Sequence, residues 1–261
     1  ITGTTNRNPE DSNLYRGNVF LQQAELSNYD FRWEWYYGNA DSMSIGLFRK
    51  EFDDPIELAK VQAQNDIFTW FNAEEAELEG IEWDLRQELL LGDWFGIEGE
   101  GWNGSIWNNF SLSANLSYID SEVTLLGSGE TAADVPLTGG RQIARLFSNE
   151  RPITGQSDWL GNLLLSYQDD NTGILATLAY NYTGERVVLV GAESSPDIIE
   201  EARGRVDVLF RYTTEAINTN IEVELKAANI FDSEVEWTQG GLLYEQYDPG
   251  ITYSFGIRAN F

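Results

Sequence analysis

The chain has 261 residues, of which 42% are apolar and 13% aromatic, and its formal net charge is −27. This acidic balance disfavours nucleic acid as a partner, and the absence of Cys and His removes disulfides, thiolate chemistry, His-ligated metals and the usual general base. No apolar run approaches the roughly 18 residues of a transmembrane helix, but a membrane β-barrel stays open because its strands carry their apolar residues in alternation.

Alternating apolar and polar residues predict long β-strands along most of the chain. In the first of them, Tyr29, Phe31 and Trp33 share one face, while Asp30 and Arg32 take the other. The predicted strands exceed the usual five or six residues of soluble sheets. They cover residues 27–37, 42–52, 76–90, 107–121, 157–167, 173–184, 203–213, 220–231 and 250–261.

The connections between these strands alternate between short and long. Short turns are expected at residues 38–41, 168–172 and 213–219, and long loops at residues 53–75, 122–156, 185–202 and 232–249. The connection 91–105 is an exception, because it should be short and is not. Sorted connections of this kind are typical of bacterial outer-membrane barrels and not of soluble sandwiches. We therefore predict an all-β, transmembrane antiparallel barrel, with residues 1–26 as an extracellular loop.

The final stretch, residues 251–261, has apolar or aromatic residues at every odd position. About ten tilted residues of this pattern cross the hydrocarbon layer of a bilayer. Placing Phe261 at the periplasmic side puts all the short turns there and all the long loops outside the cell. The aromatic residues from Trp33 to Tyr37 then lie beside a periplasmic turn, where an interfacial girdle is expected.

Several segments in this order resemble the C-terminal part of the barrel of a TonB-dependent receptor. The resemblance covers residues 27–261. It rests on Asn28-Tyr29-Asp30, Ser44-Ile45-Gly46-Leu47-Phe48-Arg49-Lys50, Pro55-Ile56-Glu57, Glu79-Gly80-Ile81-Glu82 and Leu225-Lys226-Ala227-Ala228-Asn229-Ile230-Phe231-Asp232, together with the terminal aromatic strand.

The resemblance implies a barrel of 22 strands closed around an N-terminal plug, of which this chain would supply strands 14 to 22. An odd number of strands does not close a bacterial single-chain barrel, so we expect the plug and the first strands to be absent from this chain. The expected partners are the rest of the same receptor, TonB through the plug, the outer-membrane assembly machinery, and lipid and lipopolysaccharide. No cofactor and no catalytic residue are expected.

The implied function is energised uptake of a scarce nutrient across the bacterial outer membrane. The usual substrate classes are siderophores, other metal chelates, haem, cobalamin and oligosaccharides. Two alternatives stay open: a passive porin or autotransporter-type barrel, and a secreted acidic β-protein that binds carbohydrate through its aromatic residues. A plug and TonB box upstream would exclude the first, and dependence on detergent would exclude the second.

Three groups are candidates for ligand contact, each with a structural alternative. Arg141, Arg145, Phe147 and Arg151 form a basic patch suited to an anionic chelate or a glycan, although pairing with nearby acids is also expected. Trp237, Tyr244 and Tyr247 could stack on a sugar or catecholate, or pack within their own loop. Asp53, Asp54 and Glu57 offer oxygen ligands for a divalent cation, or form a solvated rim, which is the interpretation we favour.

The end of the chain suggests a second role besides spanning the membrane. Tyr253, Phe255, Ile257 and Phe261 resemble the pattern that the outer-membrane assembly machinery reads, and Ala259 departs from the aromatic residue favoured at its position. Packing against lipid explains the same residues, and both roles are compatible.

Overall fold

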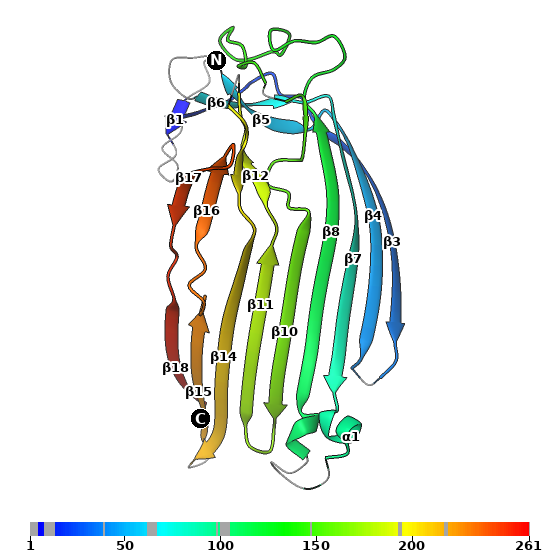
Figure 1. The fold of residues 1–261 in the computed structure, drawn as a ribbon, viewed down its shortest axis with the longest axis vertical. Coiled ribbons are helices and arrows are strands. Elements are labelled where there is room, and N and C mark those ends of the chain that lie inside the picture. Colours follow the sequence, from blue (N-terminus) through cyan, green and yellow to red (C-terminus); the bar gives the residue numbers. More distant parts are fainter. Residues whose placement is uncertain are drawn as a thin grey trace.

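The computed structural model describes residues 5–7, 14–38, 40–61, 67–97, 99, 105–146, 148–192, 195–216 and 219–260 (Figure 1). Antiparallel strands dominate this part of the chain, and its helices are the short α1 (Leu91–Phe95) and the 3₁₀ turn η2 (Ser105–Asn108). The predicted all-β, antiparallel architecture is confirmed. Neither described helix is long and apolar enough to pass through a membrane.

A single curved sheet, called the wall below, forms most of the molecule. Its nine long strands are hydrogen-bonded in the order β18-β15-β14-β11-β10-β8-β7-β4-β3, and every neighbouring pair is antiparallel. They are β3 (Glu25–Tyr36), β4 (Ser42–Asp53), β7 (Glu75–Leu89), β8 (Phe110–Thr124), β10 (Trp159–Asp169), β11 (Ile174–Thr183), β14 (Arg203–Ala216), β15 (Thr219–Ala228) and β18 (Thr252–Asn260).

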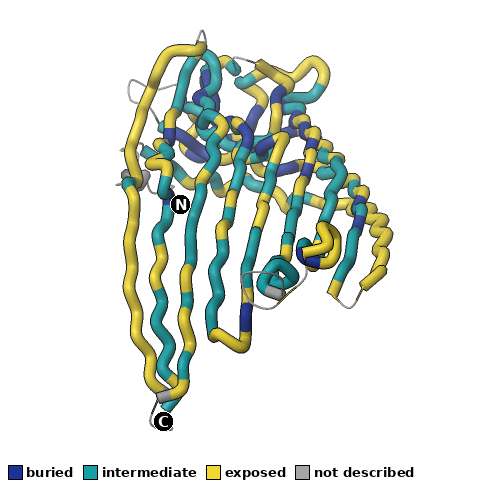
Figure 2. Tube along the Cα trace, turned by 60° about the horizontal axis from the view of Figure 1, so that its bottom comes forward, coloured by how far each residue is buried: buried dark blue, intermediate teal, exposed yellow. Residues whose placement is uncertain are grey.

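The wall does not close on itself. β3 lies at one edge of the sheet and β18 at the other, and the two are not hydrogen-bonded to each other. Figures 1 and 2 show the strands side by side along a shared curve that covers part of a cylinder. The chain therefore forms an open segment of a barrel.

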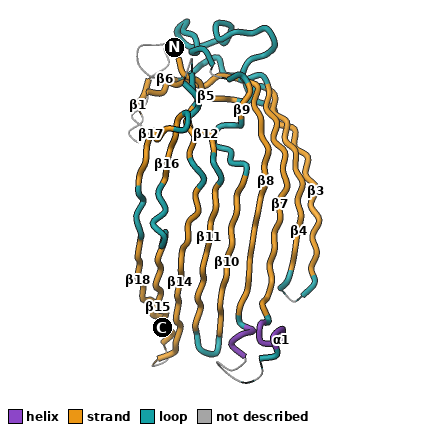
Figure 3. The backbone as a smooth tube through the Cα atoms, viewed as in Figure 1, coloured by secondary structure: helices purple, strands orange, loops and turns teal. Residues whose placement is uncertain are grey.

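The connections at the two ends of the wall differ in length. The turn between β3 and β4, the turn between β10 and β11 and the end of β18 lie at one end, and the long connections lie at the other (Figure 3). Gly173 has φ +72° in the β10–β11 turn, where a Cβ would lie 1.9 Å from the carbonyl oxygen of Thr213. Only glycine fits such a turn.

The connection from β7 to β8 is the exception at the short-turn end. It contains α1 and η2, which lie below the ends of β7 and β8 in Figure 1. The unusual length noted in the sequence therefore corresponds to a folded excursion at this end.

The long connections contain further short strands, so the prediction of plain loops there needs correction. One four-stranded sheet has the order β1-β2-β6-β5 and another has the order β12-β13-β16-β17. Their strands are β1 (Thr5–Arg7), β2 (Leu14–Arg16), β5 (Ile56–Val61), β6 (Ile67–Asn72), β12 (Arg186–Leu189), β13 (Ile198–Glu200), β16 (Val235–Gln239) and β17 (Leu242–Tyr247), and a two-residue strand, β9 (Glu150–Arg151), pairs with β8.

The two faces of the wall have opposite chemistry. On the outer face, register places Phe31 beside Leu47, and Leu47 beside Ile81, in an apolar row. On the inner face, Arg32 donates hydrogen bonds to Glu34, Ser44 and Asp84, and Arg211 pairs with Glu224. A strand exposes alternate residues to each side, so one face suits lipid and the other suits water.

The main hydrophobic core lies at the long-loop end. Phe71 and Ile143 are each 1% exposed and Val123 is fully buried. The cluster joins the β5–β6 hairpin and residues 125–146 to the inner face of β7 and β8; its members are Ala59, Val61, Phe71, Ala73, Ala76, Val123, Leu125, Val135, Leu137 and Ile143. We call this unit, residues 54–73 and 125–154, the cap.

Candidate functional site

A buried ion pair fixes one side of the cap. Arg151 Nη2 donates to Glu57 Oε2 at 2.8 Å, and the two side chains are only 4% and 8% exposed. Arg151 Nη1 donates to the hydroxyl of Thr154 at 2.7 Å, and that hydroxyl donates to Glu57 Oε2 at 3.1 Å. Arg151 therefore has an acidic partner within the protein, although its Nε is buried without a hydrogen-bond partner among the described residues. The favoured interpretation of Glu57 as part of a solvated rim needs correction, because this residue is buried and paired.

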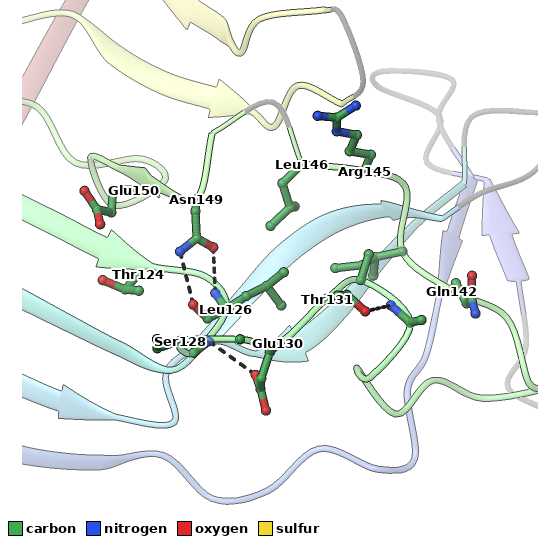
Figure 4. A pocket seen from close by; sticks show the side chains of 15 residues that line it. Thr124, Leu126, Ser128, Glu130, Thr131, Gln142, Arg145, Leu146, Asn149 and Glu150 are labelled. Carbon is green, nitrogen blue, oxygen red and sulfur yellow. Dashed lines mark hydrogen bonds between the residues drawn. The ribbon is translucent and has the colours of Figure 1, made fainter.

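A hollow of about 880 Å³ opens between the cap and the end of β8. Its walls are the end of β8 and two segments of the cap, residues 126–133 and 142–150 (Figure 4). The lining combines hydroxyls, one amide and charged groups with small aliphatic side chains. Its polar side chains are Thr124, Ser128, Glu130, Thr131, Gln142, Arg145, Asn149 and Glu150.

Hydrogen bonds to the backbone hold the shape of this hollow. Asn149 accepts from the amide of Leu126 at 2.9 Å and donates to the carbonyl of the same residue at 3.1 Å. Glu130 accepts from the amide of Gly127 at 3.2 Å, and Asp134 accepts from the amide of Thr131 at 2.7 Å. These bonds pin the two turns that form the rim.

Arg145 supplies the positive charge of the hollow. Its side chain is exposed, and within the described ranges it forms no ion pair. Figure 4 shows it at the top of the lining, with Glu130 at the bottom. Arg141 is also exposed but is not part of the lining, and Phe147 lies outside the described residues. Of the predicted basic patch, Arg145 alone therefore lines the hollow.

The titrating groups at the rim are acidic. The pKa of Asp134 is lowered, chiefly by the hydrogen bond from the Thr131 hydroxyl and then by the bond from the Thr131 amide. Asp134 therefore stays ionised at neutral pH beside the acidic Glu130. An isolated arginine among acids suits a ligand with both anionic and hydrogen-bonding groups.

The predicted aromatic group lies elsewhere, on the β16–β17 hairpin. Tyr244 and Tyr247 are 51% and 52% exposed, and they are three residues apart in one strand, so they point to opposite faces. Trp237 lies opposite Glu245 and is half-buried. No residue of this hairpin lines the hollow. The structure therefore does not assemble these three aromatic residues into one stacking platform.

The predicted acidic group is also dispersed. Asp53 ends β4, Asp54 occupies a turn at φ +53°, and Glu57 is paired with Arg151. Among the described residues, no cluster of three or more acidic side chains has the geometry of a metal site.

The predicted assembly residues lie on the outer face of β18. Tyr253, Phe255 and Ile257 are 75%, 64% and 64% exposed, and β15 is the one described strand that pairs with β18. Phe261 lies outside the described residues. β18 therefore has both an edge without a described partner strand and an exposed row of apolar side chains.

Sequence reasoning missed most of the hollow. Glu130, Thr131 and Asn149 are common loop residues, and nothing in their spacing marks a ligand site. They come together because residues 125–146 fold over the β5–β6 hairpin, which is a tertiary contact and has no local pattern.

A family model and a solved structure match this architecture. The family model described as "TonB dependent receptor-like, beta-barrel" matches residues 2–230. No curated protein sequence matches. Among solved structures, the FrpB iron transporter from Neisseria meningitidis superimposes with a TM-score of 0.54 at 11% identity, covering 92% of this chain and 31% of that one. A mutant of the ferric enterobactin receptor PfeA from Pseudomonas aeruginosa gives a TM-score of 0.49 at 15% identity, covering 85% and 28%. The chain thus spans about a third of the length of these structures.

Proposed function

Because the chain belongs to the TonB-dependent receptor family, whose members are outer-membrane β-barrels, we propose that it is the C-terminal part of a receptor that imports a scarce nutrient by energised transport. The observation that carries this proposal is the open antiparallel wall, apolar outside and charged inside, with its long connections gathered at one end. This is a family of transporters and receptors, and we propose no enzymatic activity for this chain.

The outer face of β7 supports a position in the membrane. Leu85, Trp83 and Ile81 follow one another on this face, and Glu79 and Glu77 continue it toward the long-loop end. A strand of 15 residues is about 50 Å long, which exceeds the roughly 30 Å hydrocarbon layer. Arg49 pairs with Glu77 and Glu79 at 3.0 and 3.6 Å, as surface charges do. The lipid boundary then falls between Ile81 and Glu79.

The two free edges support a larger assembly. Unpaired backbone groups are costly in hydrocarbon, so β3 and β18 need neighbouring strands. We propose that the rest of the same receptor supplies these strands and a plug inside the wall, and that TonB acts through the plug. β18 would engage the outer-membrane assembly machinery, and the outer face would contact lipid and lipopolysaccharide.

The hollow in the cap supports a role in capturing the ligand. It lies at the long-loop end, which this orientation places outside the cell, and Arg145 offers there a guanidinium that pairs with no acid of the described ranges. An anionic chelate such as a ferric siderophore fits this charge, and cobalamin, haem and oligosaccharides are the other classes that we retain. The matched FrpB protein is an iron transporter, which is consistent with the first class.

Uptake by cells tests the proposal. The full-length receptor is expressed in a host lacking its own receptors, and growth is scored on a panel of ferric siderophores, cobalamin and oligosaccharides with and without a functional TonB. Growth on at least one nutrient that requires TonB is expected. Equal, TonB-independent leakage of small solutes would instead support the passive porin alternative.

Arg145→Ala sharpens the assignment of the ligand site. We expect at least a severalfold weaker binding of an anionic nutrient, because the hollow loses its cation. Arg141→Ala is the matched control, another exposed arginine that lies outside the lining, and should leave binding unchanged. Equal effects of both substitutions would remove the hollow from the proposal.

A further inference from the structure

The excursion between β7 and β8 exposes a compact group of apolar side chains. Phe95 is 73% exposed, Trp94 54%, Ile97 37% and Leu90 36%. They surround α1 at the short-turn end of the wall, where the β10–β11 connection is a polar turn from Asp170 to Gly173. Exposed apolar groups of this kind mark a surface that meets lipid or a partner.

The polar groups of the excursion are used internally. The amide of Asp93 donates to Asn108 Oδ1 at 3.2 Å, and Asn108 Nδ2 donates to Asp93 Oδ1 at 2.9 Å. Gly96, at φ +62°, ends α1, and the amide of Ile97 donates to the carbonyl of Gly92 at 2.8 Å. These bonds hold α1 against η2, so the exposed side chains belong to an ordered unit.

Aromatic contacts join this unit to the outer face of the wall. Trp107 in η2 stacks on Phe110, with ring centroids 6.3 Å apart and planes at 25°. Phe110 in turn contacts Tyr167 at 5.1 Å. Register places Phe110 beside Tyr167 and Leu89, in the row that continues through Leu112 on the outer face. The unit is therefore attached to the lipid-facing side of the rim.

Charge also favours lipid contact at this surface. Asp93 is the one charged side chain among the described residues 90–97 and 105–109, and it is bonded to Asn108. Tryptophan and other aromatic residues favour the boundary between headgroups and hydrocarbon. Short amphipathic segments bury their apolar side in this boundary layer.

We propose that residues 90–97 and η2 form an interfacial anchor that inserts Trp94, Phe95 and Ile97 into the phospholipid leaflet at the short-turn end. This inference rests on the proposed position of the wall in the outer membrane. The anchor extends the aromatic girdle beyond the wall at one place, below β7 and β8, and would fix the height of the barrel in the membrane there.

Spin labelling of the full-length receptor in phospholipid vesicles tests the anchor. This chain contains no Cys, so labels are introduced by Phe95→Cys, by Asn171→Cys in the neighbouring turn, and by Leu163→Cys in the middle of the outer face. Collisions with lipid-soluble oxygen are compared with collisions with a water-soluble nickel chelate. We expect residues 95 and 163 to favour oxygen severalfold over residue 171.

The three labels separate the possible failures. Nickel access at residue 163 would overturn the membrane position itself. Oxygen access at residue 163 with nickel access at residue 95 would overturn only the anchor and indicate a surface facing the periplasm.

A second measurement covers the case in which Phe95→Cys does not assemble. Brominated phospholipids quench tryptophans that lie in the membrane, and Trp94→Phe should remove part of the quenched fluorescence. An unchanged quenched fraction in this variant would also overturn the anchor.

Discussion

The wall and the cap are stabilised in different ways. Along β3, all twelve residues are exposed, and the strand is held by its backbone pairing with β4. In the cap, by contrast, Val61, Phe71 and Ile143 are almost completely buried in a packed cluster. The apolar outer face of the wall is suited to contact with lipid, while the cap is held together by a buried hydrophobic core of its own.

The difference has a physical origin in the hydrophobic effect. Burial of apolar side chains away from water stabilises the cap by about 25 cal/mol per Å². Outer-face residues of the wall gain little from contact with one another, because lipid is as apolar as they are. The same substitution should therefore destabilise the cap much more than the wall.

The largest effect is expected from breaking the buried ion pair of the cap. Arg151→Ala leaves the Glu57 carboxylate buried without its partner, which should destabilise the cap by roughly 3–5 kcal/mol. Proteolysis of the long connections in assembled receptor measures this, and heat-induced unfolding of the wall should change little. The double variant Arg151→Met with Glu57→Leu should recover most of the loss. A double variant as labile as the single one would contradict this explanation.

A matched pair of isoleucines compares the two regions directly. Ile143→Ala empties a site that is 1% exposed and should destabilise the cap by about 2–5 kcal/mol. Ile257→Ala removes the same atoms from a side chain that is 64% exposed on the outer face, and should cost much less. Hydrogen exchange in β5 and β6 reports the first change, and heat-induced unfolding of the barrel reports the second. Similar costs at both sites would refute the distinction.

Asn229 lies at the junction between β15 of the wall and β16 of the second small sheet, and its substitution should have an intermediate effect. It is 4% exposed at φ +57°, where its side chain accepts from the amide of Ser233 and donates to the carbonyls of Ser233 and Gly250. Asn229→Ala should cost roughly 1–3 kcal/mol through lost hydrogen bonds and backbone strain. Asn229→Gly removes the same hydrogen bonds without backbone strain, so its loss of stability measures the contribution of the hydrogen bonds alone. Equal stability of the alanine variant and the wild type in heat-induced unfolding would contradict this role.

The wall was predictable from sequence because its pattern is local. Each strand alternates between lipid and lumen, so β3 and β11 differ from the predicted segments by only a few residues at each end. The family motifs also have simple reasons in the structure. At Gly80, a Cβ would lie 2.4 Å from the carbonyl of Tyr118 and 2.6 Å from the ring of Phe48, so glycine leaves room for that ring.

The cap was not predictable because its order is tertiary. The β5–β6 hairpin reads as an acidic, mixed segment until residues 125–146 cover one of its faces and bury Val61 and Phe71. Likewise, Arg151 and Glu57 are 94 residues apart, and neither has a local feature that indicates the other. The predicted basic patch separates for the same reason: Arg151 pairs with the distant Glu57, and Arg145 lines the hollow. The spacing of these arginines along the chain does not indicate which of them meets a distant acid.

The smallest expected effect is a dependence on pH at the junction that contains Asn229. Desolvation raises the pKa of Asp232, and repulsion from Asp248 and Glu234 raises it further. Because the folded protein binds this proton more tightly than the unfolded chain, the unfavourable contribution is full at neutral pH and fades as pH falls through the raised pKa. Protection of residues 229–234 from hydrogen exchange should therefore increase slightly as pH falls from 7 toward the ordinary Asp pKa of about 3.9, and Asp232→Asn should remove this change.

Asp134 in the cap is a control for Asp232, because its pKa is shifted in the opposite direction. The lowered pKa of Asp134 contributes stability above the pKa of the unfolded chain, about 3.9 for Asp, and this stability is lost only as pH falls through the lower, folded value. Over the same fall in pH, the turn at Thr131 should thus keep its protection while the junction gains some. Because both carboxylates are exposed, salt should weaken the change at the junction. A parallel change in both segments would show that the pH acts on the whole receptor and not on Asp232.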